Sequence, residues 1–491
     1  MSDGPGYRGQ DINDREHVIM GQSHFTAPTD RKLTQRASRR VGQLGWARVA
    51  ILGGACVMLA ACGSLTDREE RIFGQRFDTR VPLSATLPNA AGEVPVIDET
   101  PVDRTAPISL PAAQQIAAWP QRGANAQNRI PHAAFAGQGQ IWAVDIGAGN
   151  GRRNRLTADP VAGGGRIFTL DADGQVTAVS EAGSVLWRAD LTAGFDRGGG
   201  ISGGGLALEG GGLYVATGYG EVVALDAASG DVRWRQRLDA GATTPTVAGG
   251  LVYVVSRDNQ AWAIDASSGR VRWQLQTAPS GAVLKGGAAP AVADGTVLFP
   301  FGTGELIAAS ANAGVRSWGT TVAGERRGVA YANVNDISGD PLIVGGTAYV
   351  GNQSGRVVAL NASSGTRLWT AQDGAYSPLL PAGGALFFVS DRNELIRLDA
   401  ATGERVWGTE LPLFVNSRER RRRAVFTHFG PILAGGQLVV ASGDGALRFF
   451  DPASGTQTRE ISFRGGAASN PIVMNGTLYV VSESGRLLAF R

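Results

Sequence analysis

The chain has 491 residues, 70 of them glycine, and a formal net charge of +3. Its mean hydropathy is close to zero, which predicts a globular protein rich in tight turns. The positive excess lies in residues 1–61, which hold eight Arg or Lys and five Asp or Glu, so the remainder is formally neutral. A general electrostatic attraction to nucleic acid or another polyanion is therefore excluded.

Residues 1–61 predict a cleaved leader. A basic stretch over residues 31–48 precedes the apolar run Val49–Ala61, which has the length of a signal-peptide core and is short for a membrane span. The run ends in Leu59–Gly63, and small residues before a cysteine resemble the lipobox of bacterial lipoproteins. That resemblance implies cleavage before Cys62, a diacylglycerol on its thiol, and sorting to the outer membrane. The alternative is an ordinary secretory signal with a chance cysteine.

The cysteine count agrees with this interpretation. Cys56 lies inside the leader and Cys62 would carry lipid, so no cysteine remains for a disulfide, a metal or a nucleophile. Residues 62–118 carry regularly spaced prolines, which are unfavourable in both helix and sheet. We expect this segment to be an extended tether.

From about residue 160 the chain repeats one frame. A copy reads Leu213–Ala216, Gly220–Asp226, Ser229-Gly230 and then Trp234. The apolar runs predict strands, a Gly or Asn supplies the positive φ of a tight hairpin, and the Asp can accept backbone N–H groups in an Asx turn. Periods of about 40 to 50 residues fit four strands and their loops, so the repeat predicts a β-propeller.

A tryptophan recurs where the outer strand of each copy is expected. Its fixed spacing predicts a wedge packed between neighbouring blades, with the indole N–H bonded near the surface. The six residues are Trp187, Trp234, Trp273, Trp318, Trp369 and Trp407. The next copy has Arg459 at this position.

The last copy ends at Arg491 and lacks its outer strand. Because an open sheet edge invites aggregation, the ring must close. We expect the lone strand-like run Gln140–Asp145 to supply the missing strand. The predicted fold class is therefore all-β: an eight-bladed β-propeller of four-stranded antiparallel blades over residues 119–491.

The repeat frame resembles the quinoprotein-type propeller motif, which specifies a fold that enzymes and scaffolds share. With the lipobox and a single propeller, residues 119–491 resemble the BamB family, the propeller lipoproteins of the outer-membrane β-barrel assembly machinery. The resemblance implies a non-enzymatic scaffold without cofactor, lipid-anchored on the periplasmic face of the outer membrane. It also implies binding to the POTRA domains of BamA and contact with unfolded outer-membrane proteins, for which weak strand addition to a blade edge is a plausible mechanism.

In that family, loops between neighbouring blades contact BamA. The similar positions here fall in residues 282–287, 324–327 and 335–341, where an apolar anchor is ringed by charges, as in binding hot spots. Lys285 stands where the family has arginine, and Ser338 stands where it has a second acid. The alternative for the apolar pair is simply the start of a strand. The predicted BamA-binding residues are Val283, Leu284, Lys285, Arg326, Arg327 and Asp336.

The sequence also bears on other functions and other sites. A quinone-cofactor (PQQ) dehydrogenase would resemble its family in a vicinal cysteine pair and a stacking tryptophan, but no cysteine is available and the tryptophans are assigned to blades. His132 and His428 lie too far apart in sequence to suggest a metal site, and an isolated histidine is usually structural. An envelope scaffold for another complex stays open. The run Arg418–Arg423 predicts either a contact with anionic lipid or an acidic partner, or a solvated loop.

Overall fold

The computed structural model describes residues 103–152, 154–194, 203–279, 286–322, 324, 334–376 and 378–491. All of them belong to one compact unit, Asp98–Arg491. The leader, the lipobox with Cys62 and most of the expected tether lie outside the described residues.

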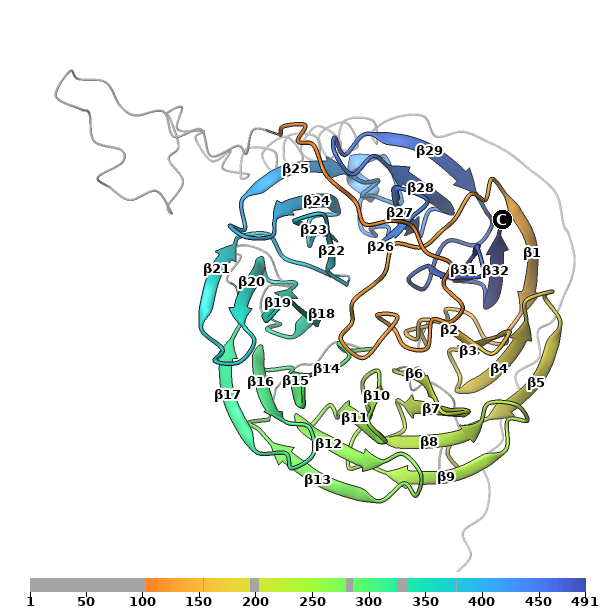
Figure 1. Ribbon diagram of the computed structural model, residues 1–491. Helices are drawn as coiled ribbons and strands as arrows, with labels where there is room; N and C mark the ends of the chain where they lie inside the picture. Colours follow the sequence, from red (N-terminus) through yellow and green to blue (C-terminus); the bar gives the residue numbers. More distant parts are fainter. Residues whose placement is uncertain are drawn as a thin grey trace, which may run out of the picture. The chain divides into compact units, whose positions relative to one another are not determined.

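The described chain forms eight four-stranded antiparallel sheets arranged as the blades of a propeller (Figure 1). Blades one to four consist of β2 (Val161–Gly163), β3 (Arg166–Leu170), β4 (Gln175–Ser180) and β5 (Val185–Asp190); β6 (Gly204–Glu209), β7 (Gly212–Thr217), β8 (Glu221–Asp226) and β9 (Val232–Arg237); β10 (Thr246–Ala248), β11 (Leu251–Val255), β12 (Gln260–Asp265) and β13 (Val271–Gln276); and β14 (Ala291–Ala293), β15 (Thr296–Pro300), β16 (Glu305–Ser310) and β17 (Arg316–Thr321). Blades five to eight consist of β18 (Ile337–Val344), β19 (Thr347–Asn352), β20 (Arg356–Asn361) and β21 (Arg367–Ala371); β22 (Leu380–Ala382), β23 (Ala385–Val389), β24 (Glu394–Asp399) and β25 (Arg405–Glu410); β26 (His428–Ala434), β27 (Gln437–Ser442), β28 (Ala446–Phe450) and β29 (Gln457–Ser462); and β30 (Ile472–Met474), β31 (Thr477–Ser482) and β32 (Arg486–Phe490) with β1 (Gln140–Asp145).

The burial of each strand follows from its place in the blade. The second and third strands are buried on both faces, as in β7 and β8, because each blade packs between two neighbours. The outer strands alternate exposed and half-buried residues, as in β9 and β13. Among the described residues, no helix is long and apolar enough to cross a membrane.

The ring closes as predicted. β1 pairs antiparallel with β32, from Gln140 opposite Phe490 to Asp145 opposite Arg486. Two strands separated by more than three hundred residues therefore complete blade eight, and the sheet leaves no unpaired edge at the C-terminal strand.

The six recurring tryptophans lie between neighbouring blades. Each of the six indoles packs against the turn glycine of the next blade, and its Nε1 donates to a backbone carbonyl there at 3.0 to 3.3 Å. Trp142 of β1 makes the same contact to Gly183 and Glu181 of blade one, a seventh wedge that the sequence frame did not reveal. The Asx turns are also present: Asp226 Oδ1 accepts the backbone N–H groups of Ala228 and Ser229.

A segment ahead of β1 crosses the inside of the ring (Figure 1). This segment, residues 106–137, is called the plug. Its hydrogen bonds reach every blade, mostly near the end of the innermost strand: Trp119 to Ala162, Pro120 to Leu208, Gln121 to Val247, Ala126 to Val292, Gln127 to Ile343, Ala106 to Arg397, Ala133 to Leu433 and Ile116 to Asn475. The part of the plug before residue 119, expected in the tether, thus lies against the propeller.

Candidate functional site

The antiparallel strand order gives the propeller two different faces. Turns from first to second strand and from third to fourth strand lie at one end of each blade, called the hairpin face. Turns from second to third strand and the connections between blades lie at the other end, called the connection face. The plug contacts the ends of the innermost strands nearest the hairpin face. Long connections, which carry binding residues most often, therefore share the connection face.

The predicted BamA-binding residues belong to these connections. Val283, Leu284, Lys285, Arg326 and Arg327 lie outside the described residues. Asp336 directly precedes β18, is only 4% exposed, and already takes part in an interaction within the chain. The following Ser338 donates its hydroxyl to the carbonyl of Ala375 at 2.6 Å. The base of this connection is thus fixed to the next blade.

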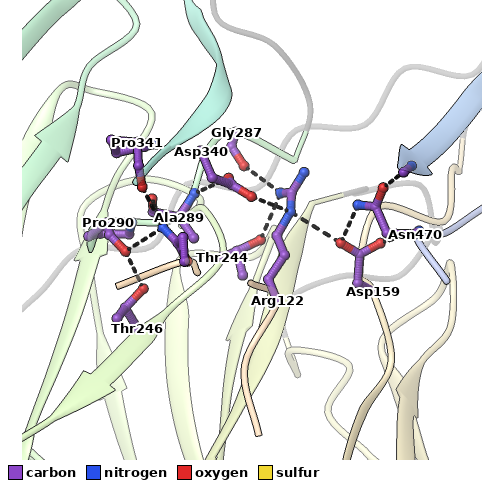
Figure 2. Close-up of polar contacts among 12 residues, drawn as sticks. Arg122, Asp159, Thr244, Thr246, Gly287, Ala289, Pro290, Asp340, Pro341 and Asn470 are labelled. Carbon is purple, nitrogen blue, oxygen red and sulfur yellow. Dashed lines mark hydrogen bonds and ion pairs between the residues drawn. The ribbon is translucent and has the colours of Figure 1, made fainter. Parts of the chain in front are cut away.

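A cavity of about 440 Å³ lies inside the ring, lined mainly by residues that precede the innermost strands or lie at the start of them, and also by Arg122 of the plug and by residues at the turns from second to third strand, such as Gln353 and Asn393. Its buried polar lining includes Arg122 of the plug, Asp159 and Asn470, whose polar contacts are drawn in Figure 2. Two partly exposed side chains line its mouth: the aromatic ring of Tyr376, which is 38% exposed, and the aliphatic side chain of Val425, which is 52% exposed. The cavity therefore has a buried polar lining and an apolar rim.

Arg122 ties the plug to four blades from inside the ring (Figure 2). Its Nε lies 3.1 Å from Oδ2 of Asp159 and 3.1 Å from Oδ2 of Asp340, although neither contact has the geometry of a hydrogen bond. Its Nη1 donates to the carbonyl of Gly287 at 3.0 Å and to the hydroxyl of Thr244 at 3.4 Å. One guanidinium thus joins blades one, three, four and five.

The charges of this cluster depend on each other. Burial raises the pKa of Asp340, and the attraction of Arg122 offsets this only in part. For Arg122, burial alone lowers the pKa, but the carboxylates of Asp340 and Asp159 outweigh it and the net direction is upward. Asp159 is further satisfied by the backbone N–H and side-chain amide of Asn470, both at 2.7 Å. Two buried acids therefore depend on a single arginine.

The connection between β25 and β26 forms a projecting hairpin, residues 411–427, called the arm. Phe414 pairs with Val425, the backbone N–H of Val415 donates to Ala424 at 3.0 Å, and that of Phe426 donates to Leu413 at 2.9 Å. A single turn of 3-10 helix, η3 (Glu419–Arg421), forms its tip. The charged run predicted as a contact or a solvated loop is therefore the end of an ordered hairpin.

His428 fastens the base of the arm. Its Nε2 lies 2.8 Å from the carbonyl of Pro412, and its Nδ1 lies 2.8 Å from the hydroxyl of Ser442. Burial lowers the pKa of His428. His132 lies elsewhere, bonded to Pro111 and Gly436. Each histidine thus serves a structural contact, and the described residues hold no group of three His, Cys, Asp or Glu placed to bind a metal.

Neither the cavity nor the Arg122 cluster was anticipated from the sequence. Arg122 and Asp159 lie before the first full repeat, so no spacing relates them to each other or to Asp340. One sequence signal could have pointed to this region. The residues just before each innermost strand do not follow the repeat frame, and binding loops on a regular scaffold vary in the same way.

Fold and site together define a closed eight-bladed propeller whose connections gather on one face around a central cavity. The family model described as "Outer membrane protein assembly factor BamB" matches residues 132–198, 172–409 and 417–491. The chain belongs to the BamB family.

Individual relatives agree with this membership. The outer membrane protein assembly factor BamB of Yersinia pestis is 25% identical over 358 residues, which is 72% of this chain and 88% of the relative. That of Escherichia coli K12 is 27% identical over 350 residues, which is 70% of this chain and 86% of the relative. In its fold, the chain is also similar to the crystal structure of BamB from Moraxella catarrhalis, with a TM-score of 0.59 over 72% of this chain and 99% of that one; at 19% identity this likeness shows the fold alone.

The fold is shared with enzymes as well. A europium-containing methanol dehydrogenase matches with a TM-score of 0.58 over 74% of this chain and 89% of that one, but at 13% identity, so the likeness shows the fold alone. The relatives in sequence are named as assembly factors and not as enzymes, which supports a non-enzymatic role.

Proposed function

We propose that this chain is a lipid-anchored scaffold of the outer-membrane β-barrel assembly machinery, bound through Cys62 to the periplasmic face of the outer membrane. Family membership over most of the propeller carries the proposal. The lipobox resemblance supports the anchor. Changing Cys62 to serine removes the thiol that would carry the lipid and is expected to remove the chain from the outer-membrane fraction, and unchanged fractionation would contradict the anchor.

The partner in this proposal is BamA, whose POTRA domains bind the connection face. Two observations support the choice of face: all blade connections lie there, and two of the proposed loops reach the central cavity through Gly287 and Ser338. In the proposed contact Leu284 is the apolar anchor, with Val283, Lys285, Arg326 and Arg327 around it. Asp336 is buried, so we assign it to holding its loop in place at the edge of the contact.

The test is a pull-down from detergent-solubilised envelopes. Wild type is expected to recover BamA and Leu284→Glu to lose it, because a charge replaces the apolar anchor. The matched control is Ala228→Glu, which adds the same charge at an exposed turn of the hairpin face. Asp336→Asn keeps the shape of the buried side chain and tests its role in positioning the loop.

Recovery of BamA by both glutamate variants would reject the chosen anchor and keep the family role. If wild type recovers BamA and neither glutamate variant does, the added charge causes a generic defect. If wild type does not recover BamA either, the chain is a scaffold of another envelope complex.

Unfolded outer-membrane proteins are the second proposed partner. The outer strand of each blade, such as β9 or β13, is the terminal strand of its four-stranded sheet, so its outer edge has no partner strand within that sheet and is proposed to accept weak strand addition. Photo-crosslinkers on exposed positions of β9 and β13 are expected to capture precursor chains. Capture of BamA from the connection face together with no precursor from these strands would reject strand addition.

A further inference from the structure

The arm presents an unusual concentration of positive charge. Its tip carries five arginines and one acid, and all six side chains are exposed: Arg418, Glu419, Arg420, Arg421, Arg422 and Arg423. Within the described part of the chain, no ion pair engages these arginines. Arg422 makes an aromatic contact, with its guanidinium carbon 5.0 Å from the ring centroid of Phe414. A cluster without a charge-balancing partner among the described residues fits an anionic partner.

Apolar side chains are exposed on the same hairpin, but at its base. Phe414 and Val415 on one strand and Val425 on the other are 37%, 54% and 52% exposed. A loop that enters a membrane needs the reverse order, with apolar residues at the tip and cations behind them at the level of the head groups. An apolar centre with a charged rim is instead the arrangement of a protein interface.

The apolar base leads directly into the cavity. The consecutive residues Val425, Phe426, Thr427 and His428, on the returning strand of the arm and at the start of β26, line the cavity wall. The carbonyl of Phe426 accepts the side-chain amide of Asn393 at 2.9 Å, so this wall is fixed to blade six. A volume of about 440 Å³ with an apolar rim can receive a large side chain of a partner.

We propose that the arm and the cavity beside it dock an acidic protein segment, whose carboxylates meet the arginine tip while an apolar side chain enters the cavity mouth. The contact uses none of the residues assigned above to BamA binding. Both contacts border the same cavity, on which Gly287 and Ser338 also lie, but the arm variant and the Leu284 variant change different residues, so the failure of one contact is distinguishable from the failure of the other.

The test measures fluorescence anisotropy of a labelled peptide in which a central phenylalanine is flanked by glutamates on both sides. The full chain is compared with an arm variant, Arg420→Gln with Arg421→Gln and Arg422→Gln. A control variant, Arg129→Gln with Arg270→Gln and Arg464→Gln, removes the same charge from exposed positions elsewhere. The arm variant is expected to bind about tenfold more weakly, since several exposed charge pairs are lost together, and the control variant is expected to match wild type.

The cavity is tested separately by Val425→Asn, which places an uncharged polar group at the mouth and leaves the charge of the docking surface unchanged. This variant is expected to weaken the phenylalanine peptide and to leave unchanged a peptide with serine at the centre. Circular dichroism and thermal melting of each variant exclude unfolding as the cause.

Equal losses in the arm and control variants, or equal binding of a peptide with lysines in place of glutamates, would overturn the proposal. So would arm-dependent binding of phosphatidylglycerol vesicles in place of the peptide, which would make the partner a lipid surface.

Discussion

The contact between a tryptophan and a glycine repeats around the ring and joins each blade to the next. A Cβ placed on Gly230 would lie 2.7 Å from Cε3 of Trp187, and the φ of Gly230 is +83°. Glycine is therefore required twice at this turn, once for the backbone and once for the indole that lies on it. The exception is instructive: Arg459 replaces the tryptophan in blade seven, where the following blade has no third-to-fourth strand turn because β1 supplies its fourth strand. Arg459 instead donates to the carbonyl of Gly137 at 2.8 Å and covers the ring of Phe449.

The two requirements for glycine at position 230, a positive φ and room for the Trp187 indole, can be separated experimentally. Gly230→Ala is expected to lower the free energy of unfolding by about 1–3 kcal/mol more than Gly211→Ala, because the added methyl must displace the indole. Gly211 is the matched control, with a φ of +74° and no atom within 4 Å of the place where its methyl would lie. Chemical denaturation measures both. In a Trp187→Ala background the difference between the two alanines is expected to vanish, and its persistence would assign the cost to the backbone alone.

Repeated residues were predictable and unique ones were not. The wedge tryptophans, the turn glycines and Asp226-type acceptors each recur at fixed spacing, so their common environment could be inferred from the pattern. Arg122 occurs once, and its partners Asp159 and Asp340 are distant in sequence. Its role follows only from the ring that brings the inner strands together.

Among the elements, β1 has the largest consequence for the whole ring. Asp145 and Arg486 lie directly opposite each other in the antiparallel pair of β1 and β32, and both are exposed. Opposed residues in such a pair have Cα separations that suit a disulfide. With Cys56 and Cys62 changed to serine, the pair Asp145→Cys and Arg486→Cys is expected to form a disulfide and raise the free energy of unfolding by about 2–4 kcal/mol. The reduced protein is the control for the lost side chains.

The arm provides the second prediction at this scale. Because burial lowers the pKa of His428, the neutral ring is favoured in the folded state, and the unfolded chain takes up a proton at a higher pH. Its contribution to stability is therefore present above pH about 6.5 and is lost as the pH falls towards the folded pKa, by at most about 1.4 kcal/mol per pH unit. Denaturant midpoints at pH 7.5 and 5.5 are expected to differ less in His428→Gln than in wild type. An equal difference would assign the acid sensitivity to other groups.

At the scale of the whole molecule, the sequence predicted the ring and missed its interior. The fold class and the closing strand could be inferred because repeats and an unpaired edge constrain them. The plug carries neither periodicity nor a continuous strand pattern, and many of its hydrogen bonds join its backbone to backbone groups of the innermost strands, which any extended segment can satisfy. The position of the plug therefore follows from the structure of the ring and could not be predicted from the plug's own sequence.

The plug and the ring are coupled through Arg122, and this coupling can be measured. Replacing Arg122 by methionine keeps the packing of the stem but leaves Asp159 and Asp340 buried, with side chains only 5% and 1% exposed, without their cation. Removing one partner of a buried ion pair costs about 3–5 kcal/mol of unfolding free energy. Adding Asp340→Asn is expected to recover part of this loss, because Asp159 keeps its two hydrogen bonds from Asn470 and the other buried charge is gone. If Asp340→Asn further destabilises the methionine variant, the acids are stabilised by their own backbone contacts and the plug does not depend on the ion pair.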